Sequence, residues 1–323
     1  MINCQALWYV GRQKVELRNE QVPPPSKGEA LVKAHYSGIS RGTERLIFNG
    51  QVPQSEYERM RCPMQAGAFP FPVKYGYALT GEVVEGPSDL IGKFVFALHP
   101  HQELACIKED NLHQIPKGTA TRRASLAANM ETAVNVIWDA ELKPNEDVLI
   151  IGGGILGLLI ARLIVQADQN QVTVADPQAT RAQVIERLGA LYSRPENIEM
   201  DYDVIIHTSA TENGLMLALN HAAPDGRIVE ASWFGDKVIA LPLGETFHSR
   251  RLRLISSQVG AIPPSQRAKW SPTMRIQKAL DHLNDELLDA LITNEIDFSE
   301  APERIPGILS GNAAGLMTIL RYN

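Results

Sequence analysis

Three glycines with a fixed spacing are the residues of this chain best suited to hold a phosphate-bearing ligand. The stretch from Asp147 to Gly157 reads DVLIIGGGILG, an apolar run, a glycine turn and a second apolar segment. Such a turn needs one glycine for the tight bend, one for close approach of a pyrophosphate and one for packing of helix on strand. The helix start adds free N–H groups and a positive dipole end. The residues predicted to contact a dinucleotide here are Gly152, Gly154, Ile155, Leu156 and Gly157.

An acidic residue at the end of the next predicted strand indicates which dinucleotide is preferred. Asp176 follows the run 171–175 and lies 19 positions after Gly157. A carboxylate there accepts hydrogen bonds from both hydroxyls of the adenosine ribose and repels a 2′-phosphate. The sequence therefore favours NAD(H) and leaves NADP(H) as the second choice. Arg181, five residues further on, could soften the preference or could be a solvated residue of the next helix.

The composition is that of an ordinary globular chain of about two domains. Of its 323 residues, 44% are hydrophobic and 21% are charged, and the net charge is −6. A chain without a basic run has no electrostatic footprint for nucleic acid, and no apolar stretch approaches the ~20 residues that span a bilayer. Three scattered cysteines and an N-terminus without a signal-peptide pattern favour a cytoplasmic protein. We expect a small molecule as the partner, with neither nucleic acid nor membrane.

The pattern of predicted secondary structure changes near residue 120. Residues 1–120 combine short β-like runs with glycine and proline turns, whereas later residues alternate between strands and helices. Strands are predicted at 147–151, 171–175, 203–208, 227–232 and 251–258, and helices near 124–140, 155–167, 178–188, 213–222 and 272–283. Alternation of this kind indicates a parallel, doubly wound sheet. We expect an α/β protein with a Rossmann domain at 121–260 and a β-rich domain formed by 1–120 and 261–323.

This order of domains and two motifs resemble the medium-chain dehydrogenase/reductase superfamily over essentially the whole chain. The motifs are SGISRGTE at Ser37–Glu44 and GYA at Gly76–Ala78. In zinc-containing members the corresponding motifs read G-I-C-[GR]-[ST]-D and G-H-E, and a further Cys or Glu precedes the Rossmann domain. Ser40, Tyr77 and Ala128 stand at those ligand positions, and none is a donor that zinc prefers. The resemblance implies a GroES-like catalytic domain, no catalytic zinc and a homodimer.

The first motif is similar to the branch that includes the bacteriochlorophyllide hydroxyethyl dehydrogenases, and it supplies the candidate catalytic residues. Without a metal, a developing alkoxide needs other donors. Tyr77 could donate its phenol proton or could fill the volume that the metal vacates, and Ser40 could donate likewise. Thr43 matches a proton-relaying hydroxyl of relatives, or it could cap a helix. Arg41 could stabilise an anion or form a surface pair with Glu44, which could instead hold a side chain at a ligand position.

Other residues give weaker indications. Thr132 matches a position that contacts the nicotinamide amide in relatives. His99 and His101 are expected to be solvated in a loop, with another metal as the alternative. The aromatic residues of 48–72 suggest either a roomy apolar pocket for a bulky substrate or a packed surface loop. The basic edges of that pocket would be Arg59, Arg61 and Lys74.

We therefore predict a zinc-independent oxidoreductase that prefers NAD(H) and transfers hydride between nicotinamide and a carbonyl/alcohol pair. Two alternatives stay open. One is reduction of an activated C=C bond, as in enone or quinone reductases, because that reaction needs no Lewis acid. The other is a dinucleotide-binding protein without catalytic activity.

Overall fold

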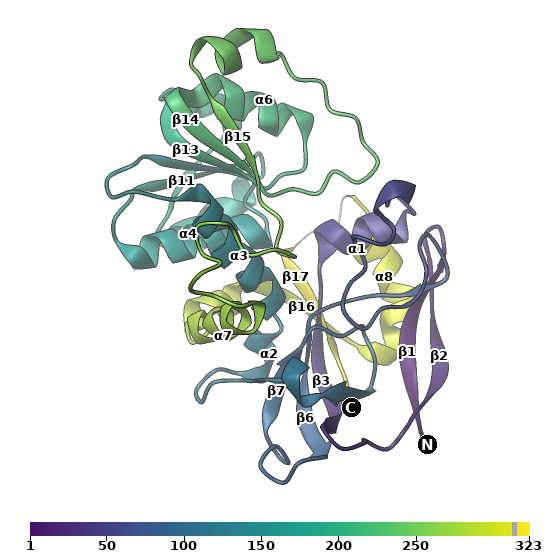
Figure 1. Ribbon diagram of the computed structural model, residues 1–323. Helices are drawn as coiled ribbons and strands as arrows, with labels where there is room; N and C mark the ends of the chain where they lie inside the picture. The colour runs from purple at the N-terminus through teal and green to yellow at the C-terminus, as the bar shows by residue number, and fades with distance from the viewer. Residues whose placement is uncertain (312–314) are drawn as a thin grey trace. The chain divides into compact units, whose positions relative to one another are not determined.

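The chain passes twice between two units that each have their own sheets. The computed structural model describes residues 1–311 and 315–323, and it divides into Met1–Ala128 with Ile276–Asn323, and Asn129–Arg275 (Figure 1). The sequence placed these boundaries near 120 and 261. The difference has a structural cause: both divisions fall inside helices, α3 (Ala127–Ala140) and α7 (Pro272–His282), where the composition does not change.

The unit of residues 129–275 is built on a parallel sheet, and the predicted α/β fold class is confirmed. The strands follow the order β12-β11-β10-β13-β14-β15. This is the order of a doubly wound dinucleotide-binding sheet, which reverses direction between β10 and β13. The strands are β10 (Val148–Ile151), β11 (Val172–Ala175), β12 (Leu191–Ser193), β13 (Tyr202–His207), β14 (Ala222–Glu230) and β15 (Arg253–Ser256). Its connecting helices are α4 (Ile155–Ala167), α5 (Ala182–Arg187) and α6 (Glu212–His221).

The central strands of this sheet are buried because helices pack on the sheet. All four residues of β10 are buried, which explains their uninterrupted apolar sequence. Leu149 and Ile205 belong to an apolar core that also contains Leu215 and Leu219 of α6. The carboxyl ends of the strands stay at one edge, where the loops that follow β10, β11 and β13 lie.

The other unit is rich in antiparallel strands. One sheet has the order β2-β1-β5-β4, and another has the order β16-β17-β3-β6-β7-β9, with β8 also paired to β3. The strands are β1 (Ile2–Gly11), β2 (Lys14–Val22), β3 (Glu29–Ile39), β4 (Ala66–Gly67), β5 (Val73–Lys74), β6 (Leu79–Glu85), β7 (Phe94–Ala97), β8 (Leu104–Lys108), β9 (His113–Gln114), β16 (Ile292–Asp297) and β17 (Met317–Arg321). Its helices include α1 (Arg41–Phe48), α2 (Thr121–Ala124) and α8 (Ala301–Leu309). The tail returns to this unit because β17 pairs with β3, with Leu320 opposite Ser37.

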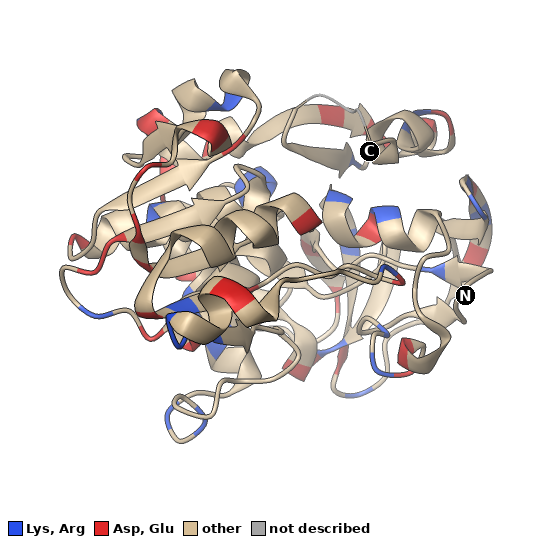
Figure 2. Ribbon diagram, turned by 90° about the horizontal axis from the view of Figure 1, so that it is seen from above, with Lys and Arg blue, Asp and Glu red and all other residues tan. Residues whose placement is uncertain are grey.

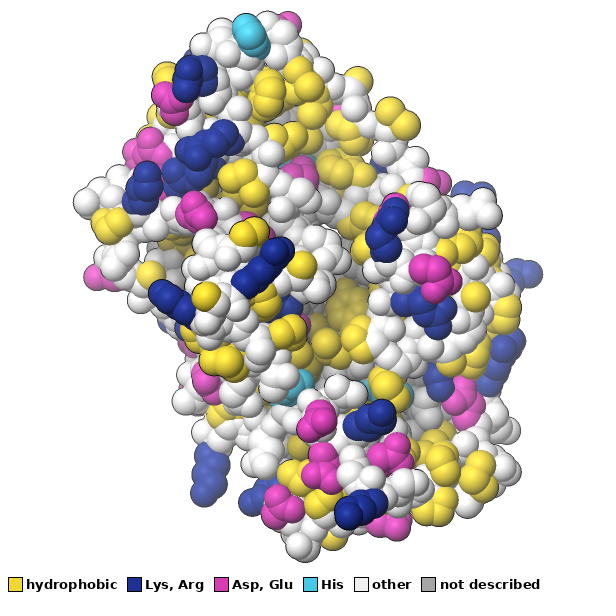
Figure 3. Space-filling view, in the orientation of Figure 1, with side chains coloured by type: hydrophobic (Ala, Val, Ile, Leu, Met, Phe, Trp, Pro, Cys, Tyr) yellow, Lys and Arg dark blue, Asp and Glu magenta, His cyan; other side chains and the backbone are white. Residues whose placement is uncertain are grey.

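Charges of both signs are mixed over the elements and over the face that the space-filling view presents (Figures 2 and 3). In the part of the chain that the structure describes, no helix is both long and apolar enough to cross a membrane.

Candidate active site

Most candidate catalytic residues lie at the start of α1, which follows β3 directly. These residues are Ser40, Arg41, Thr43 and Glu44. Tyr77 lies just before β6, far away in the sequence. Because β6 pairs with β3 and Leu79 lies opposite Ser37, the residues before β6 run beside the residues after β3. The strand pairing thereby brings Tyr77 to Ser40.

The side chains of Ser40, Thr43 and Tyr77 form what we call the hydroxyl cluster. The Tyr77 phenol donates a hydrogen bond to Ser40 Oγ at 2.5 Å and is also hydrogen-bonded to the Thr43 side chain. Burial raises the pKa of Tyr77 to about 12, although both hydrogen bonds oppose the rise. A phenol with this pKa keeps its proton at neutral pH. The cluster can therefore donate a hydrogen bond to an oxygen atom that gains negative charge.

Glu44 is buried and fixes the beginning of α1. Its Oε1 accepts a hydrogen bond from the Ser40 N–H at 2.7 Å, and its Oε2 accepts from the Tyr9 hydroxyl at 2.6 Å and from His101 Nε2 at 3.1 Å. Burial and the charge of Glu44 raise the pKa of Tyr9 well above its usual value, so Tyr9 stays a donor. Glu44 is 0% exposed. The alternative of a pair between Arg41 and Glu44 on the surface is therefore wrong, and Glu44 instead holds the backbone of Ser40.

The network that continues from Glu44 was not found from the sequence. His101 Nδ1 and Ser37 Oγ are 2.7 Å apart, and Ser37 Oγ lies 2.8 Å from the Tyr322 hydroxyl. The expectation that His99 and His101 are solvated is wrong, because they are 5% and 0% exposed. Leu7 N–H donates to the His101 carbonyl at 2.9 Å, so the histidine segment passes beside β1. The apolar residues on both sides of that segment were the available signal.

Two basic side chains expected near the site have other partners. Arg41 donates to the carbonyl oxygen of Gly315 at 2.8 Å. Lys74 is buried, and its Nζ donates to Glu20 at 2.6 Å and to Gln102 at 2.7 Å. The prediction that Lys74 forms the basic edge of a pocket is therefore wrong, since an ion pair and a hydrogen bond hold the cation in the interior.

The aromatic residues expected to line a pocket pack against one another. Tyr57 and Phe69, Phe69 and Tyr75, and Tyr75 and Tyr77 have ring centroids 5.8, 5.8 and 6.0 Å apart. Phe69 and Tyr75 are buried. We call these four rings the aromatic row. In this row, Tyr75 packs against one side of the Tyr77 ring and so restricts the positions that the Tyr77 hydroxyl can take.

The glycine turn after β10 is closely packed at two of its glycines and open at the third. Gly152 has a φ of +114°, and a Cβ there would lie 2.8 Å from Thr208 Oγ1. A Cβ on Gly157 would clash with the Gly152 carbonyl oxygen, whereas Gly154 is exposed and faces open space. Gly154 also begins α4 without a side-chain cap. The N–H groups of the first turn of α4 are therefore not satisfied by a capping side chain, as an anion-binding helix start requires.

Asp176 lies beside this turn, at the end of β11. Its Oδ2 accepts a hydrogen bond from Gly153 N–H and its Oδ1 accepts from Gln178 N–H, both at 2.8 Å. An ionised carboxylate has further acceptor sites, so Asp176 can also accept from ribose hydroxyls. Arg181 is partly buried near Asp176; burial lowers the pKa of Arg181 and the carboxylate opposes that shift. The residues present thus fit a dinucleotide.

The other predicted cofactor contacts have partly exposed side chains. Ile155 and Leu156 form the first turn of α4, and Thr132 lies on α3.

The donor set does not fit a catalytic zinc ion. Hydroxyl groups of Ser40 and Tyr77 bond to each other, and Ala128 has no donor atom. Zinc prefers thiolate, imidazole and carboxylate. Within residues 1–311 and 315–323, no group of three or more His, Cys, Asp or Glu side chains is placed to hold a metal ion.

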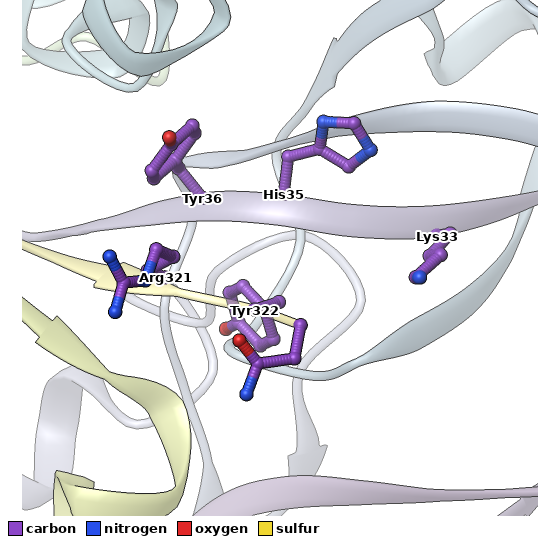
Figure 4. Close-up of a pocket in the computed structure, with 6 residues that line it drawn as sticks. Lys33, His35, Tyr36, Arg321 and Tyr322 are labelled. Atoms are coloured by element: carbon purple, nitrogen blue, oxygen red, sulfur yellow. The ribbon is translucent and has the colours of Figure 1, made fainter.

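A shallow hollow of about 160 Å³ lies elsewhere in the β-rich unit (Figure 4). It is lined by Lys33, His35, Tyr36, Arg321, Tyr322 and Asn323. Arg321 forms ion pairs with Asp297 and Glu295. Because that cation is already paired and no candidate catalytic residue lines the hollow, the hydroxyl cluster remains the candidate site.

Comparison with known proteins gives a consistent class of relatives. No family model matches the chain. It is 24% identical over 311 residues to D-guloside 3-dehydrogenase of Escherichia coli K12, covering 85% of this chain and 87% of that protein. It is 26% identical over 318 residues to 2-desacetyl-2-hydroxyethyl bacteriochlorophyllide A dehydrogenase of Cereibacter sphaeroides, covering 91% and 90%. The crystal structure of L-idonate 5-dehydrogenase from Escherichia coli K-12 shares the fold, with a TM-score of 0.82, 15% identity and coverage of 99% and 98%.

Proposed function

We propose, from the chain's place in the medium-chain dehydrogenase/reductase superfamily, that it is an oxidoreductase acting on an alcohol or carbonyl compound with a nicotinamide nucleotide. Its curated relatives are named as dehydrogenases of a sugar derivative and of a bacteriochlorophyllide. Solved neighbours of the fold are bound to NADH or to NADP. The finer proposal is that the reaction runs without zinc and with NAD(H) preferred.

The hydroxyl cluster is the observation that carries the zinc-independent form of this proposal. When bound, a nicotinamide nucleotide supplies or accepts the hydride. The protein must then stabilise the charge that develops on the substrate oxygen. Tyr77 does this with a retained proton: its O–H donates to the substrate oxygen in place of Ser40 Oγ. Ser40 and Thr43, already hydrogen-bonded to the phenol, would then relay a proton from solvent water to the phenolate, which leaves hydroxide in the solvent and restores the phenol.

The raised pKa of Tyr77 favours reduction of a carbonyl over oxidation of an alcohol. Oxidation of an alcohol needs the phenolate as the base. With a pKa of about 12, the phenolate of Tyr77 is scarce at neutral pH. The phenol still protonates an alkoxide, which is far more basic. We therefore propose ketone or aldehyde reduction as the faster direction near neutral pH.

The preference for NAD(H) follows from Asp176. Its carboxylate retains acceptor sites for two ribose hydroxyls, and its charge repels a 2′-phosphate. Arg181 lies near the same carboxylate and acts in the opposite sense. We propose that the carboxylate dominates, because it directly bonds the backbone of the glycine turn at Gly153.

Binding, metal content and turnover test this proposal on the full-length chain. NADH and NADPH titrations followed by fluorescence should give tighter binding of NADH, and Asp176→Ala should remove the difference. Purified protein should contain far less than one zinc per chain and should keep its turnover after dialysis against EDTA. Tighter binding of NADPH would refute the cofactor preference, and stoichiometric zinc would refute the metal-free site.

A substrate screen separates the remaining alternatives. NADH oxidation is measured with keto sugars and bulky aromatic ketones, and in parallel with enones and quinones. Turnover of ketones supports the proposal. Turnover confined to enones or quinones would assign C=C reduction instead. Cofactor binding without turnover of either class would indicate a non-catalytic dinucleotide-binding protein.

A further inference from the structure

A second polar network lies at the carboxyl edge of the parallel sheet and plays no part in the chemistry proposed above. His207 ends β13, and Glu230 ends the neighbouring strand β14. His207 Nδ1 lies 2.6 Å from Glu230 Oε2, and His207 Nε2 lies 2.7 Å from Ser209 Oγ. Ser209 Oγ lies 2.9 Å from Thr211 Oγ1, which accepts a hydrogen bond from Gly214 N–H at 3.1 Å. We call these side chains the edge relay.

For a neutral His207 ring, the two ends of the edge relay set the direction of its hydrogen bonds. The N–H of Gly214 can only donate, and the ionised carboxylate of Glu230 can only accept. With a neutral imidazole, His207 donates from Nδ1 to Glu230 and accepts at Nε2 from the Ser209 hydroxyl. Thr211 in turn donates to Ser209. The proton of Ser209 is therefore committed inside the relay, and its oxygen keeps one lone pair free for a ligand that donates.

A serine, a histidine and a carboxylate in hydrogen-bonded sequence also form the catalytic triad of enzymes with a serine nucleophile. Ser209 cannot act as such a nucleophile. A nucleophilic serine needs a histidine that passes the proton on to a leaving group. His207 is 0% exposed and stacks on Phe234 with ring centroids 6.1 Å apart. A leaving group cannot reach it. Ser209 is partly exposed, so it is the member that a ligand can touch.

The relay depends on the absence of a side chain at one position of α6, which packs against β13 and β14 (Figure 1). A Cβ on Gly214 would lie 2.6 Å from His207 Nε2 and 2.9 Å from Thr211 Oγ1. Any other residue would push these groups apart. Gly214 thus lets the helix approach closely enough for the relay to close.

Ser209 lies next to the glycine turn, on the side opposite Asp176. A Cβ on Gly152 would come within 3.0 Å of the Ser209 backbone nitrogen. In the sheet, β10 has β11 on one side and β13 on the other, so Asp176 and Ser209 follow the two neighbours of β10. A dinucleotide lies across this switch point, with one mononucleotide over each half of the sheet. Asp176 belongs to the half of the adenosine ribose, and Ser209 to the other half.

We propose that Ser209 accepts a hydrogen bond from a hydroxyl of the ribose that carries the nicotinamide, and that His207 and Glu230 are positioning residues for it. This inference rests on the proposed function, since it needs a bound nicotinamide nucleotide. The direction of the hydrogen bonds in the edge relay leaves Ser209 Oγ as an acceptor. An acceptor suits a sugar hydroxyl, which can donate, whereas a phosphate group needs donors. Ser209 thus complements Asp176, which serves the first ribose.

Binding of NADH, ADP-ribose and ADP tests the inference, because each ligand lacks one group of the ligand before it. NADH and ADP-ribose both contain the second ribose, whereas ADP lacks it. Ser209→Ala should weaken NADH and ADP-ribose about five- to tenfold, the value of one hydrogen bond, and should leave ADP unchanged. Asp176→Ala should weaken all three ligands. Ser193→Ala is the matched control, because Ser193 ends β12 at the same edge and its Oγ donates to the carbonyl oxygen of its neighbour Arg194.

His207→Phe tests the positioning role. It keeps an aromatic ring against Phe234 but removes both hydrogen bonds, so it should reproduce the loss for NADH and ADP-ribose while ADP binding is kept. A general loss of structure would weaken all three ligands alike. If Ser209→Ala leaves the ratio of NADH to ADP affinity unchanged, the inference is wrong while the proposed function stands. If the wild-type chain binds no nicotinamide nucleotide, the proposed function itself fails.

Discussion

In the proposed reaction, a tyrosine takes the place of a metal ion in polarising the substrate oxygen. A zinc ion attracts the oxygen without moving a proton, whereas Tyr77 offers a hydrogen bond and, in the end, a proton. Its ring is packed by Tyr75, and its hydroxyl is held by Ser40 and Thr43. Glu44 in turn fixes the backbone of Ser40. In the proposed mechanism, the position of the Tyr77 hydroxyl therefore depends on a buried acidic side chain that does not touch the substrate.

Removal of the Tyr77 hydroxyl should impair turnover without affecting cofactor binding. We expect Tyr77→Phe to lower kcat for carbonyl reduction about a hundredfold, as loss of an oxyanion donor does, with an unchanged Kd for NADH. Tyr57→Phe is the control, because Tyr57 belongs to the same aromatic row but lies outside the hydroxyl cluster. Unchanged kcat in Tyr77→Phe would remove this residue from the mechanism.

The pH dependence of turnover should reflect the raised pKa of Tyr77. The protonated phenol is the donor, so the active form is present below the pKa and is lost as the pH rises through about 12. An ordinary tyrosine ionises near 10. We therefore expect kcat for reduction, measured from pH 6 to 10.5, to show no loss with a midpoint near 10. A fall at that point that Tyr77→Phe abolishes would contradict the assigned pKa direction.

At the scale of elements, the sequence predicts helix bounds that local residues set. It does not predict hydrogen bonds between residues that are far apart in the chain. The helix expected at 155–167 is α4 (Ile155–Ala167), because Gly154 and the left-handed Asp168 mark its ends. The helix α8 was missed, since it contains Pro302 and Pro306. Networks were missed for another reason: the Tyr9–Glu44 and Ser37–Tyr322 bonds join residues 35 and 285 positions apart. No periodicity in the chain records such pairs.

The turn before α4 offers two substitutions with opposite consequences. Gly154→Ala faces open space at a φ of −80°, so it should change stability by less than about 1 kcal/mol but weaken NADH binding about tenfold by blocking backbone approach. Gly157→Ala forces a Cβ onto the Gly152 carbonyl and should cost about 2 kcal/mol or more of stability. Urea unfolding and NADH titration distinguish the two. Equal effects of both substitutions on unfolding would refute this division of roles.

At the scale of the whole molecule, the fold alone does not set the substrate. The relatives named above act on a guloside and on a bacteriochlorophyllide, although each resembles this chain over most of its length. The candidate polar sites of this chain lie in its side chains: the hydroxyl cluster in one unit and the edge relay in the other. The sequence alone was sufficient for the fold class and the glycine turn. It could not supply the edge relay, because strand pairing and the missing side chain of Gly214 create it.

We propose that the chain forms a homodimer through the outer edge of β15. Because β15 ends the described sheet, its outer backbone edge can pair with a second copy, and Leu254 on this strand is 40% exposed. Light scattering should give twice the 35.6 kDa of one chain. A charge on the edge opposes pairing, so Leu254→Glu should shift the mass towards the monomer. Val238→Glu, at a 94% exposed position outside the sheet, should not. A monomeric wild-type chain would refute the dimer, and a dimer that Leu254→Glu leaves intact would place its interface elsewhere.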